Sequence, residues 1–207
     1  MAAADVNNDL AAAIERLSGD GFAVIDDFVP PALVRRLAER LDNLQAADAL
    51  ATAGLGREGE RQVDRSIRRA AIRWLDTSDA AEADLLALAE TIRIAINGHL
   101  FLGLFHFECN FISYPVGGFY RRHLDSLAGA RNRVISFTTY LDPDWHAEDG
   151  GALRIWRAPD DLGPPALDVL PRAGRVALML SEEIPHEVLP TNRPRRAIAG
   201  WWRVASG

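Results

Sequence analysis

The chain has 207 residues, of which 48% are hydrophobic, so it is long enough for one sizeable core. Its formal net charge of −6 at pH 7 argues against bulk binding of nucleic acid. All 23 basic residues are arginines, because the sequence contains no lysine. This absence excludes Schiff-base catalysis, a pyridoxal-phosphate site and a phosphate-binding loop that uses lysine.

The first half of the chain alternates helical periodicity with two short strand-like runs. Leucines three or four residues apart mark one face of the second expected helix, and two prolines open it. After this helix the sequence loses its periodicity and gains glycine and charge, which is typical of a mobile loop. In chain order we expect a helix over 6–18, a strand over 21–26, a helix from Pro30 and Pro31, a mobile loop over 46–66, a strand over 67–75 and a helix over 79–97.

After Gly98 the pattern changes to short apolar, aromatic and β-branched runs between turn signals. We expect strands over 105–114, 120–124, 134–141, 152–156, 167–170, 175–181, 186–189 and 195–204. About eight strands of this length favour an α+β fold with a double-stranded β-helix core (a cupin-like jelly roll), on which the N-terminal helices pack against one sheet. We expect one domain over 1–207, with helical support and a mobile loop in 1–98 and the jelly-roll core in 99–207.

The expected location is the cytoplasm. The sequence has no run of eighteen apolar residues, so we expect no membrane-spanning helix. The N-terminal residues lack the basic and apolar regions of a signal peptide. The single cysteine, Cys109, argues against a disulfide framework and is compatible with a reducing compartment. We therefore expect neither a membrane nor nucleic acid as a partner.

Two histidines and one aspartate have the spacing of a non-haem iron(II) site. In a strand, His123 and Asp125 point to the same side while Leu124 points away, and His186 is the best placed third ligand. Two imidazoles and one carboxylate on one face of an octahedron leave three positions for a bidentate co-substrate and O2. Alone, the triplet could be a surface ion pair and His186 a core histidine. Their joint occurrence, with an arginine beyond, favours the metal site.

An arginine after the second histidine could bind a dicarboxylate co-substrate through its planar guanidinium. The expected strand over 195–204 alternates, so Arg195 shares a face with Ala197 and Trp201, while Arg196 lies on the other face. Alternation alone does not decide between the two arginines, and Arg195 could also be a solvated charge.

Several segments resemble the 2-oxoglutarate-dependent prolyl 4-hydroxylases, in the branch of the hypoxia-inducible-factor prolyl hydroxylases and their bacterial relatives. The iron-binding segment of that family is similar to Ser113-Tyr-Pro-Val-Gly-Gly-Phe-Tyr-Arg-Arg-His-Leu-Asp125. The resemblance covers most of the chain from about residue 65 and continues through 67–74, 93–97, 139–145, 150–155, 184–188 and 195–201.

The resemblance implies roles for individual residues. His123, Asp125 and His186 match the iron ligands, and Arg195 matches the arginine that binds the distal carboxylate of 2-oxoglutarate, which decides against Arg196. Tyr140 matches a tyrosine that bonds the same carboxylate. Further pocket residues of the family correspond to Tyr114, Leu153, Val188 and Trp201. The implied cofactors are Fe(II), 2-oxoglutarate and O2, with ascorbate as a candidate, and the implied partner is a protein substrate, with elongation factor Tu as the candidate.

The arginine-rich segment 56–73 is either a lid that closes on a polypeptide or an ordinary solvated loop, and the resemblance favours the lid. The substrate-loop residues that we predict are Arg57, Arg61, Arg65, Arg68, Ile72 and Trp74. Two positions depart from the family. Ala70 replaces the acid of an Arg-Gly-Asp run, which affects loop closure. Ala199 stands where a hydroxyl residue often lies near the metal.

The function that the sequence favours is hydroxylation of a prolyl residue in a protein by a 2-oxoglutarate-dependent dioxygenase. One alternative is a related hydroxylase of a small molecule or lipid. The other is a non-catalytic cupin-like binding or sensor module, which predicts no succinate production.

Overall fold

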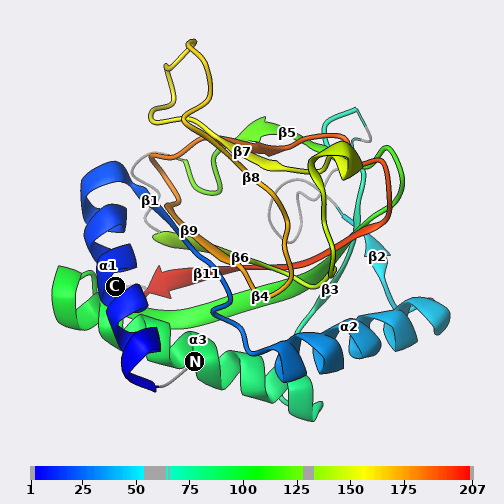
Figure 1. The fold of residues 1–207 in the computed structure, drawn as a ribbon, viewed down its shortest axis with the longest axis horizontal. Helices are drawn as coiled ribbons and strands as arrows, with labels where there is room; N and C mark the ends of the chain where they lie inside the picture. The colour runs from blue at the N-terminus through cyan, green and yellow to red at the C-terminus, as the bar shows by residue number, and fades with distance from the viewer. Residues whose placement is uncertain (1–2, 54–63, 65, 128–132, 206–207) are drawn as a thin grey trace.

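Two antiparallel β-sheets face each other, and helices cover the outer face of the larger sheet (Figure 1). The computed structural model describes residues 3–53, 64, 66–127 and 133–205. Within these residues, no helix is both long enough and apolar enough to cross a membrane.

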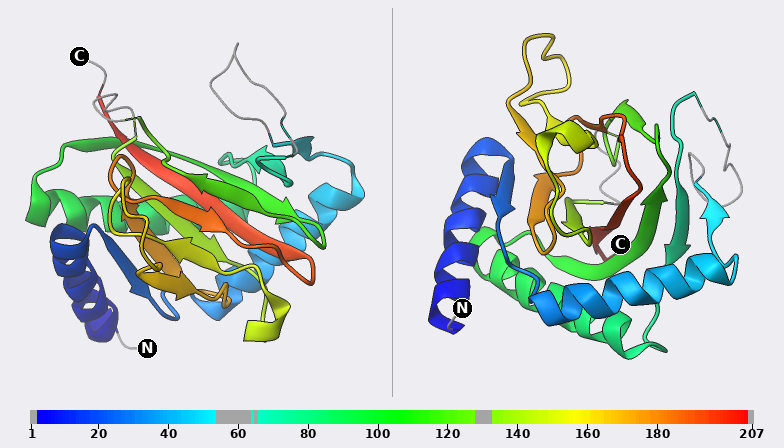
Figure 2. Two further views of the ribbon diagram at one scale, coloured as in Figure 1. Left: turned by 90° about the horizontal axis from the view of Figure 1, so that it is seen from above. Right: turned by 45° about the vertical axis from the view of Figure 1, so that its right-hand side comes forward.

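Among the described residues, the larger sheet has seven strands and the smaller sheet has four. The larger sheet has the order β1 (Phe22–Ile25), β9 (Val176–Leu180), β6 (Ile135–Tyr140), β11 (Arg195–Val204), β4 (Leu104–Tyr114), β3 (Ala71–Trp74) and β2 (Ala51–Thr52). The smaller sheet has the order β5 (Tyr120–His123), β10 (His186–Val188), β7 (Leu153–Ile155) and β8 (Leu167–Val169). The right-hand view of Figure 2, which is turned by 45° from Figure 1, shows the smaller sheet facing the larger one. This arrangement confirms the predicted α+β fold with a double-stranded β-helix core.

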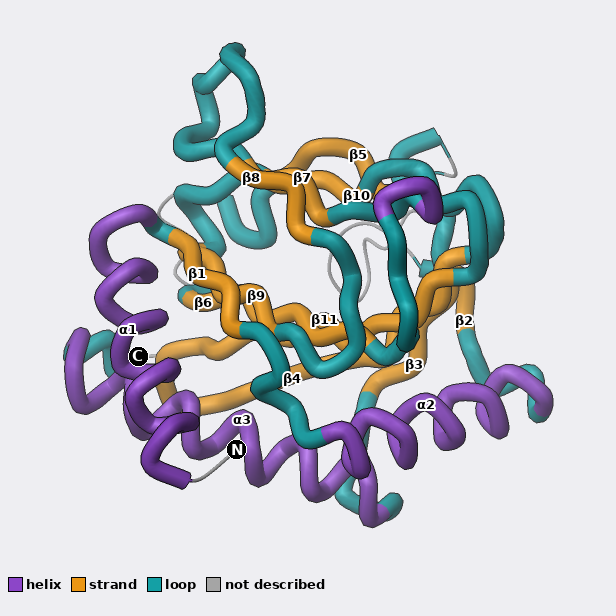
Figure 3. Tube along the Cα trace, in the orientation of Figure 1, coloured by secondary structure: helices purple, strands orange, loops and turns teal. Residues whose placement is uncertain are grey.

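Three long helices, α1 (Ala3–Asp20), α2 (Pro31–Ala46) and α3 (Ala80–Leu100), lie on one side of the molecule (Figure 3). Proline at the first position starts α2, where a missing N–H has no cost. Asp79 caps α3 by accepting hydrogen bonds from the N–H groups of Ala81 and Glu82. A short 3₁₀ helix, η1 (Ala147–Asp149), precedes β7.

Strand alternation divides the interior into two cores. On β11, Ile198 and Trp202 belong to the core between the larger sheet and the helices, while Ala197 belongs to the core between the two sheets. Gly200 lies on the helix side, where a Cβ atom would come within 2.5 Å of the Phe107 ring. The alternation predicted for this strand is therefore correct, and the face with Arg195 points into the space between the sheets.

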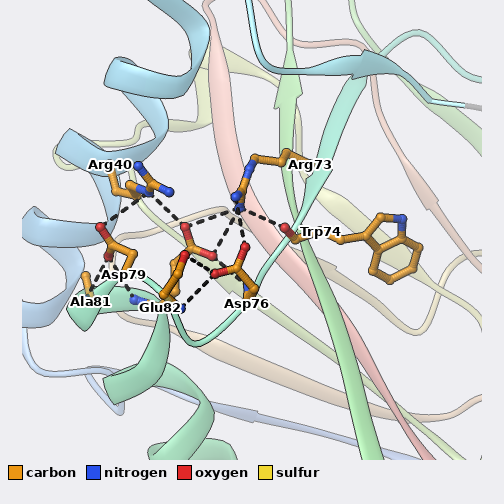
Figure 4. A network of polar contacts seen from close by, with 8 residues as sticks. Arg40, Arg73, Trp74, Asp76, Asp79, Ala81 and Glu82 are labelled. Atoms are coloured by element: carbon orange, nitrogen blue, oxygen red, sulfur yellow. Dashed lines mark hydrogen bonds and ion pairs between the residues drawn. The ribbon is translucent and has the colours of Figure 1, made fainter. Parts of the chain in front are cut away.

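A buried carboxylate joins β3 to the helices (Figure 4). Glu82 on α3 is 0% exposed and accepts hydrogen bonds from Arg40 of α2 at 2.8 Å and from Arg73 of β3 at 3.2 Å. Its Oε2 also accepts from the N–H of Asp76 at 2.8 Å. Arg73 in turn donates to the carbonyl of Trp74 at 2.8 Å. The network therefore fixes β3 and its last residue against the helical layer.

Most of the expected bounds differ from the observed ones by a few residues, and three of the differences bear on the site. The strand expected over 67–75 is confined to Ala71–Trp74. The residues before Ala71 lie beside β5 rather than along β4, because the N–H of Arg69 bonds the carbonyl of Phe119 and the N–H of Arg121 bonds the carbonyl of Ile67. The loop expected over 46–66 contains the two-residue strand β2 and the last residue of α2, and its positions 54–63 and 65 lie outside the described residues. The strand expected over 120–124 ends at His123.

Candidate metal centre and co-substrate pocket

Three potential metal ligands converge where β5 meets β10. His123 and His186 are paired across the two strands, and their ring centroids are 4.4 Å apart. Asp125 places one oxygen 3.5 Å from Nε2 of His123 and the other 3.4 Å from Nε2 of His186. Ligand atoms in neighbouring octahedral positions around a divalent metal are about 3 Å apart. The three side chains therefore fit one facial set of ligands with little rearrangement.

Asp125 reaches the site by a route that differs from the one expected from the sequence. It follows the end of β5, in a bend, so strand alternation does not bring it beside His123. The adjacent N–H of Ser126 instead bonds the carbonyl of Ser181 at 3.1 Å, which ties the bend to the end of β9. The prediction of proximity was correct, but the turn and not the pleat produces it.

Backbone carbonyls set the orientation of both imidazole rings. Nδ1 of His123 lies 2.7 Å from the carbonyl oxygen of Arg121, and Nδ1 of His186 lies 3.1 Å from that of Ile184. A carbonyl only accepts, so each Nδ1 carries the proton and each Nε2 keeps a free electron pair. Such bonds to the other ring nitrogen are usual for histidines that bind metals.

The charges of the site also suit a divalent cation. Burial alone would raise the pKa of Asp125, but the two histidines and a hydrogen bond from the Ser136 hydroxyl at 2.6 Å hold this pKa well below its usual range. Burial is the main cause that lowers the pKa of His186 to about 4, and the neighbouring Asp125 opposes this effect. At neutral pH the site therefore offers a carboxylate and a neutral imidazole, as metal ligation requires.

A second part of the interior is built to hold an anion. Arg195 is 1% exposed, and its Nε donates to the carbonyl of Gly151 at 2.9 Å. Its Cζ lies 5.0 Å from the ring centroid of Tyr114 and 5.2 Å from that of Tyr140. Gly151 has a φ of +66°, and a Cβ atom there would lie 3.0 Å from Cδ of Arg195. The backbone and two aromatic rings thus hold the guanidinium in one place.

Two polar atoms of this pocket have no partner in the part of the chain that the structure describes. Nη2 of Arg195 and the hydroxyl of Tyr140 are buried, and neither finds a hydrogen-bond partner among the residues that the structure describes. A buried guanidinium without a carboxylate is costly unless a ligand supplies the negative charge. One carboxylate could accept hydrogen bonds from both groups. The residues therefore fit the distal carboxylate of 2-oxoglutarate.

The neighbouring arginine has a different set of partners. Arg196 points toward the helices, where its Nε donates to Asp142 at 2.7 Å and its Nη1 donates to Asp42 of α2 at 2.7 Å. Both acceptors are protein carboxylates, so Arg196 is already satisfied. The structure thus supports Arg195 as the candidate for co-substrate binding.

The other predicted pocket residues also face the space between the sheets. Leu153 and Val188 are directly paired between β7 and β10, and both belong to the core that contains Tyr140. Trp201 lies on β11, with its ring 3.7 Å from the guanidinium carbon of Arg133. The side chains of Leu153 and Val188 line the interior with apolar surface, and Trp201 lies toward the other end of β11 from Arg195.

The predicted substrate-loop residues separate into three groups. Arg57, Arg61 and Arg65 lie outside the described residues. Ile72 is buried in the core between the sheets, so it is a packing residue rather than part of a loop surface. Trp74 is 46% exposed, and its ring centroid is 6.3 Å from that of Trp201. Of the described positions, Trp74 is therefore the one that offers surface to a substrate.

Arg68 is buried, which differs from the solvated loop that was one of the two interpretations of its segment. It is 9% exposed, and its guanidinium carbon lies 4.6 Å from the ring centroid of Tyr120. Tyr120 in turn stacks on His123, with centroids 3.6 Å apart and planes at 22°. Nε of Arg68 has no partner within the described part of the chain, in keeping with alanine at position 70. The segment before β3 therefore touches a metal ligand through one aromatic ring.

Sequence reasoning missed two residues that shape this centre. Tyr120 covers His123, and Ser136 donates to Asp125 and lies 2.8 Å from the hydroxyl of Ser181. Ser136 could have been suspected from strand alternation, because it lies two positions from Thr138 and four from Tyr140 on β6. The role of Tyr120 depends on a pairing between distant segments, which no local pattern reveals.

Comparison with known proteins agrees with this geometry. Residues 109–203, which include the three potential ligands and Arg195, match the 2OG-Fe(II) oxygenase superfamily. A solved Pseudomonas putida prolyl-4-hydroxylase is 39% identical, with a TM-score of 0.84 and coverage of 95% of this chain and 100% of that chain. A second solved structure is a Trichoplax adhaerens prolyl hydroxylase in complex with a peptide fragment of the hypoxia inducible factor oxygen degradation domain. It has a TM-score of 0.84 at 22% identity, with coverage of 98% of this chain and 94% of that chain.

A curated relative extends the similarity to animal enzymes. The hypoxia-inducible factor prolyl hydroxylase of Caenorhabditis elegans is 28% identical over 208 residues, which cover 91% of this chain. The chain spans only 27% of the length of that protein. Taken with the facial ligand set and the buried Arg195, these similarities show that the chain belongs to the iron(II)- and 2-oxoglutarate-dependent oxygenases, as a prolyl 4-hydroxylase related to the bacterial enzymes and to the hypoxia-inducible-factor prolyl hydroxylases.

Proposed function

We propose that the chain hydroxylates a prolyl residue in a protein, and that elongation factor Tu is the target. The 39% identity to the Pseudomonas putida prolyl-4-hydroxylase supports the reaction. The relative from Trichoplax adhaerens was solved with a peptide, which supports a polypeptide as the substrate. The resemblance to bacterial members of this branch supports elongation factor Tu. The absence of disulfides among the described residues, where Cys109 is free, is compatible with action in the cytoplasm.

The proposal assigns a task to each part of the interior. His123, Asp125 and His186 hold iron(II), and the two carbonyl-bound Nδ1 atoms keep both imidazoles in the tautomer that can bind it. When bound, iron(II) supplies the activation of O2 that couples oxidation of 2-oxoglutarate to succinate and CO2 with hydroxylation of a C–H bond.

Arg195 and Tyr140 bind the distal carboxylate of 2-oxoglutarate and so fix the orientation of the co-substrate. Tyr114 packs against the guanidinium, while Leu153 and Val188 exclude water from the pocket. Trp74, whose ring lies beside that of buried Trp201, offers aromatic surface at the exposed side of the pocket, where a prolyl ring could pack.

One observation carries the proposal most directly. The convergent histidine–aspartate–histidine set lies in the same interior as a buried arginine without an acidic partner among the described residues. Alone, the three ligands would also suit a zinc ion, and the arginine would also suit a small inorganic anion. Together they match a metal and a dicarboxylate that must be bound side by side.

The experiment that tests the proposal combines the protein with iron(II), 2-oxoglutarate and O2. Two probes are used in parallel: purified elongation factor Tu, and a pool of synthetic peptides that each contain one central proline. Mass spectrometry then measures a gain of one oxygen on proline, and succinate is quantified. We expect both signals with the wild-type chain and neither with His123→Ala. Succinate release that tracks an added small molecule or lipid instead would support the alternative hydroxylase, and no succinate with any probe would support a non-catalytic module.

A further inference from the structure

One polar side chain on the interior face of the larger sheet has no assigned role. Asn110 of β4 is 2% exposed, and its Oδ1 finds no hydrogen-bond partner among the described residues. Its neighbours Cys109 and Phe111 belong to the core beneath the helices, so alternation directs Asn110 into the space between the sheets. Buried amide oxygens are nearly always bonded, and an exception inside an active site points to a ligand.

The position of Asn110 in the larger sheet places it directly beside the exposed side chain of Trp74. In the sheet it is paired with Ala199 of β11 on one side and with Trp74 of β3 on the other. The methyl group of Ala199 offers no hydrogen bond and leaves space beside the amide. Trp74 is exposed and lies near Trp201. A chain that packs on the exposed indole ring of Trp74 therefore passes next to Asn110.

The co-substrate is a poor partner for this amide. Arg195 contacts Tyr114, which is four residues from Asn110 and thus about 13 Å away along the strand. That distance exceeds the length of a five-carbon diacid. Ionised 2-oxoglutarate also has no hydrogen-bond donor, so it cannot donate a hydrogen bond to Oδ1 of Asn110. The missing partner must carry an N–H or O–H group.

We propose that Asn110 determines specificity by accepting a hydrogen bond from the main chain of the bound polypeptide. The donor is a peptide N–H next to the target residue, because proline itself has none. This inference rests on the proposed function and deepens it, since it names a contact that selects a polypeptide over a free small molecule. A site that hydrogen-bonds its substrate discriminates strongly against analogues that lack the donor.

The test compares variants in steady-state assays with the peptide of the synthetic pool that the wild type hydroxylates fastest. Asn110→Leu keeps the branched shape of the side chain but removes the acceptor, and Asn110→Asp keeps an acceptor. Ser113→Ala on the opposite face of the same strand is the matched control, because its hydroxyl bonds Gln45 of α2 at 3.0 Å. We expect kcat/KM for the peptide to fall at least about tenfold in Asn110→Leu, less in Asn110→Asp and little in the control. The KM for 2-oxoglutarate should stay within about twofold in all three variants.

A second series identifies the donor. The same peptide is made with a methyl group on the main-chain nitrogen of each residue near the target proline in turn. At one position, methylation should lower kcat/KM for the wild type by about the same factor as Asn110→Leu, and it should have no further effect in that variant. The inference would be overturned if, at every position, methylation lowered kcat/KM by the same factor in Asn110→Leu as in the wild type. A raised KM for 2-oxoglutarate in Asn110→Leu, or an unchanged kcat/KM for the peptide in this variant, would also overturn it.

The outcomes separate the two proposals. If the wild type hydroxylates peptides but Asn110→Leu does so equally well, the inference on Asn110 fails and the proposed function stands. If the wild type hydroxylates neither the peptides nor elongation factor Tu, both fail, because no polypeptide then occupies the site.

Discussion

At the scale of single residues, two adjacent arginines on one strand lie in different environments. Arg195 lies in the interior without an acidic partner among the described residues, while Arg196 is held by Asp142 and Asp42. Sequence alternation places them on opposite faces but cannot tell which face contains the site. That distinction depends on where two aspartates from distant segments come to lie.

The first prediction concerns these two arginines. Arg195→Ala should raise the KM for 2-oxoglutarate by about a hundredfold, because a charge-assisted contact to its carboxylate is lost. Arg196→Ala should change this KM less than about threefold, but it should lower the free energy of unfolding because buried Asp142 loses its cation. Kinetics with varied 2-oxoglutarate and urea unfolding of both variants provide the check. The opposite pattern would assign the co-substrate to Arg196.

The second prediction concerns pH and the metal-free protein. Burial lowers the pKa of His186 to about 4, so the unfolded chain binds this proton more tightly than the folded chain does. Stability from neutral His186 is therefore complete above about pH 6.5 and is lost as pH falls from there toward 4, by roughly 3 kcal/mol in all. Because the pKa of Asp125 is also low, protonation of this carboxylate causes a further loss of stability at still lower pH.

Urea unfolding of the metal-free wild type and of His186→Gln, at about pH 7 and about pH 4.5, measures this effect. The variant should lose clearly less stability over this range than the wild type. An equal pH dependence in both proteins would show that His186 is not the group responsible.

At the scale of elements, the sequence predicts long strands well and short or tertiary features poorly. The bounds of β11 are as expected, because a run of ten residues is long enough to form a strong pattern. β2 has two residues, too few for any pattern. Residues 67–70 have strand-like composition, but Arg68 pairs with Tyr120 by an isolated bridge instead of extending β3. Propensity there is overridden by the stacking of Arg68, Tyr120 and His123.

The third prediction concerns the carboxylate that joins β3, α2 and α3. Glu82→Gln should lower the free energy of unfolding by about 3 kcal/mol, because Arg40 and Arg73 lose the charge that compensates them in a buried place. Asp84→Asn on the same helix is the control, since its ion pair with Arg36 is exposed and should contribute less than about 1 kcal/mol. Denaturant unfolding compares the two. Equal losses would mean that Glu82 does not anchor β3.

At the scale of the whole molecule, the two cores serve different purposes. One core joins the helices to the larger sheet and contains fully buried residues such as Trp202 and Leu37. The other lies between the sheets and contains Tyr114 and Tyr140 beside the polar groups of the site. The helical layer thus supports the larger sheet, which carries Arg195 and Tyr140 of the site.

Most of the fold class and the residues of the candidate site follow from the sequence, for two different reasons. Periodicity predicts the strands and helices. The ligand residues come from a resemblance, because nothing in the spacing of His123 and His186 says that β5 and β10 are neighbours. Asn110 was not predicted, since its significance lies in a missing partner that only the packed structure reveals. A single domain over 1–207 and a role for ascorbate stay predictions.

The measurement that tests the central claim most directly is a crystal structure with manganese(II) and N-oxalylglycine, an unreactive analogue of 2-oxoglutarate. We expect manganese about 2.2 Å from Nε2 of His123, an oxygen of Asp125 and Nε2 of His186, with the free carboxylate of the analogue bonded to Arg195 and Tyr140. A metal bound by other side chains, or an analogue whose carboxylate lies away from Arg195, would contradict the account.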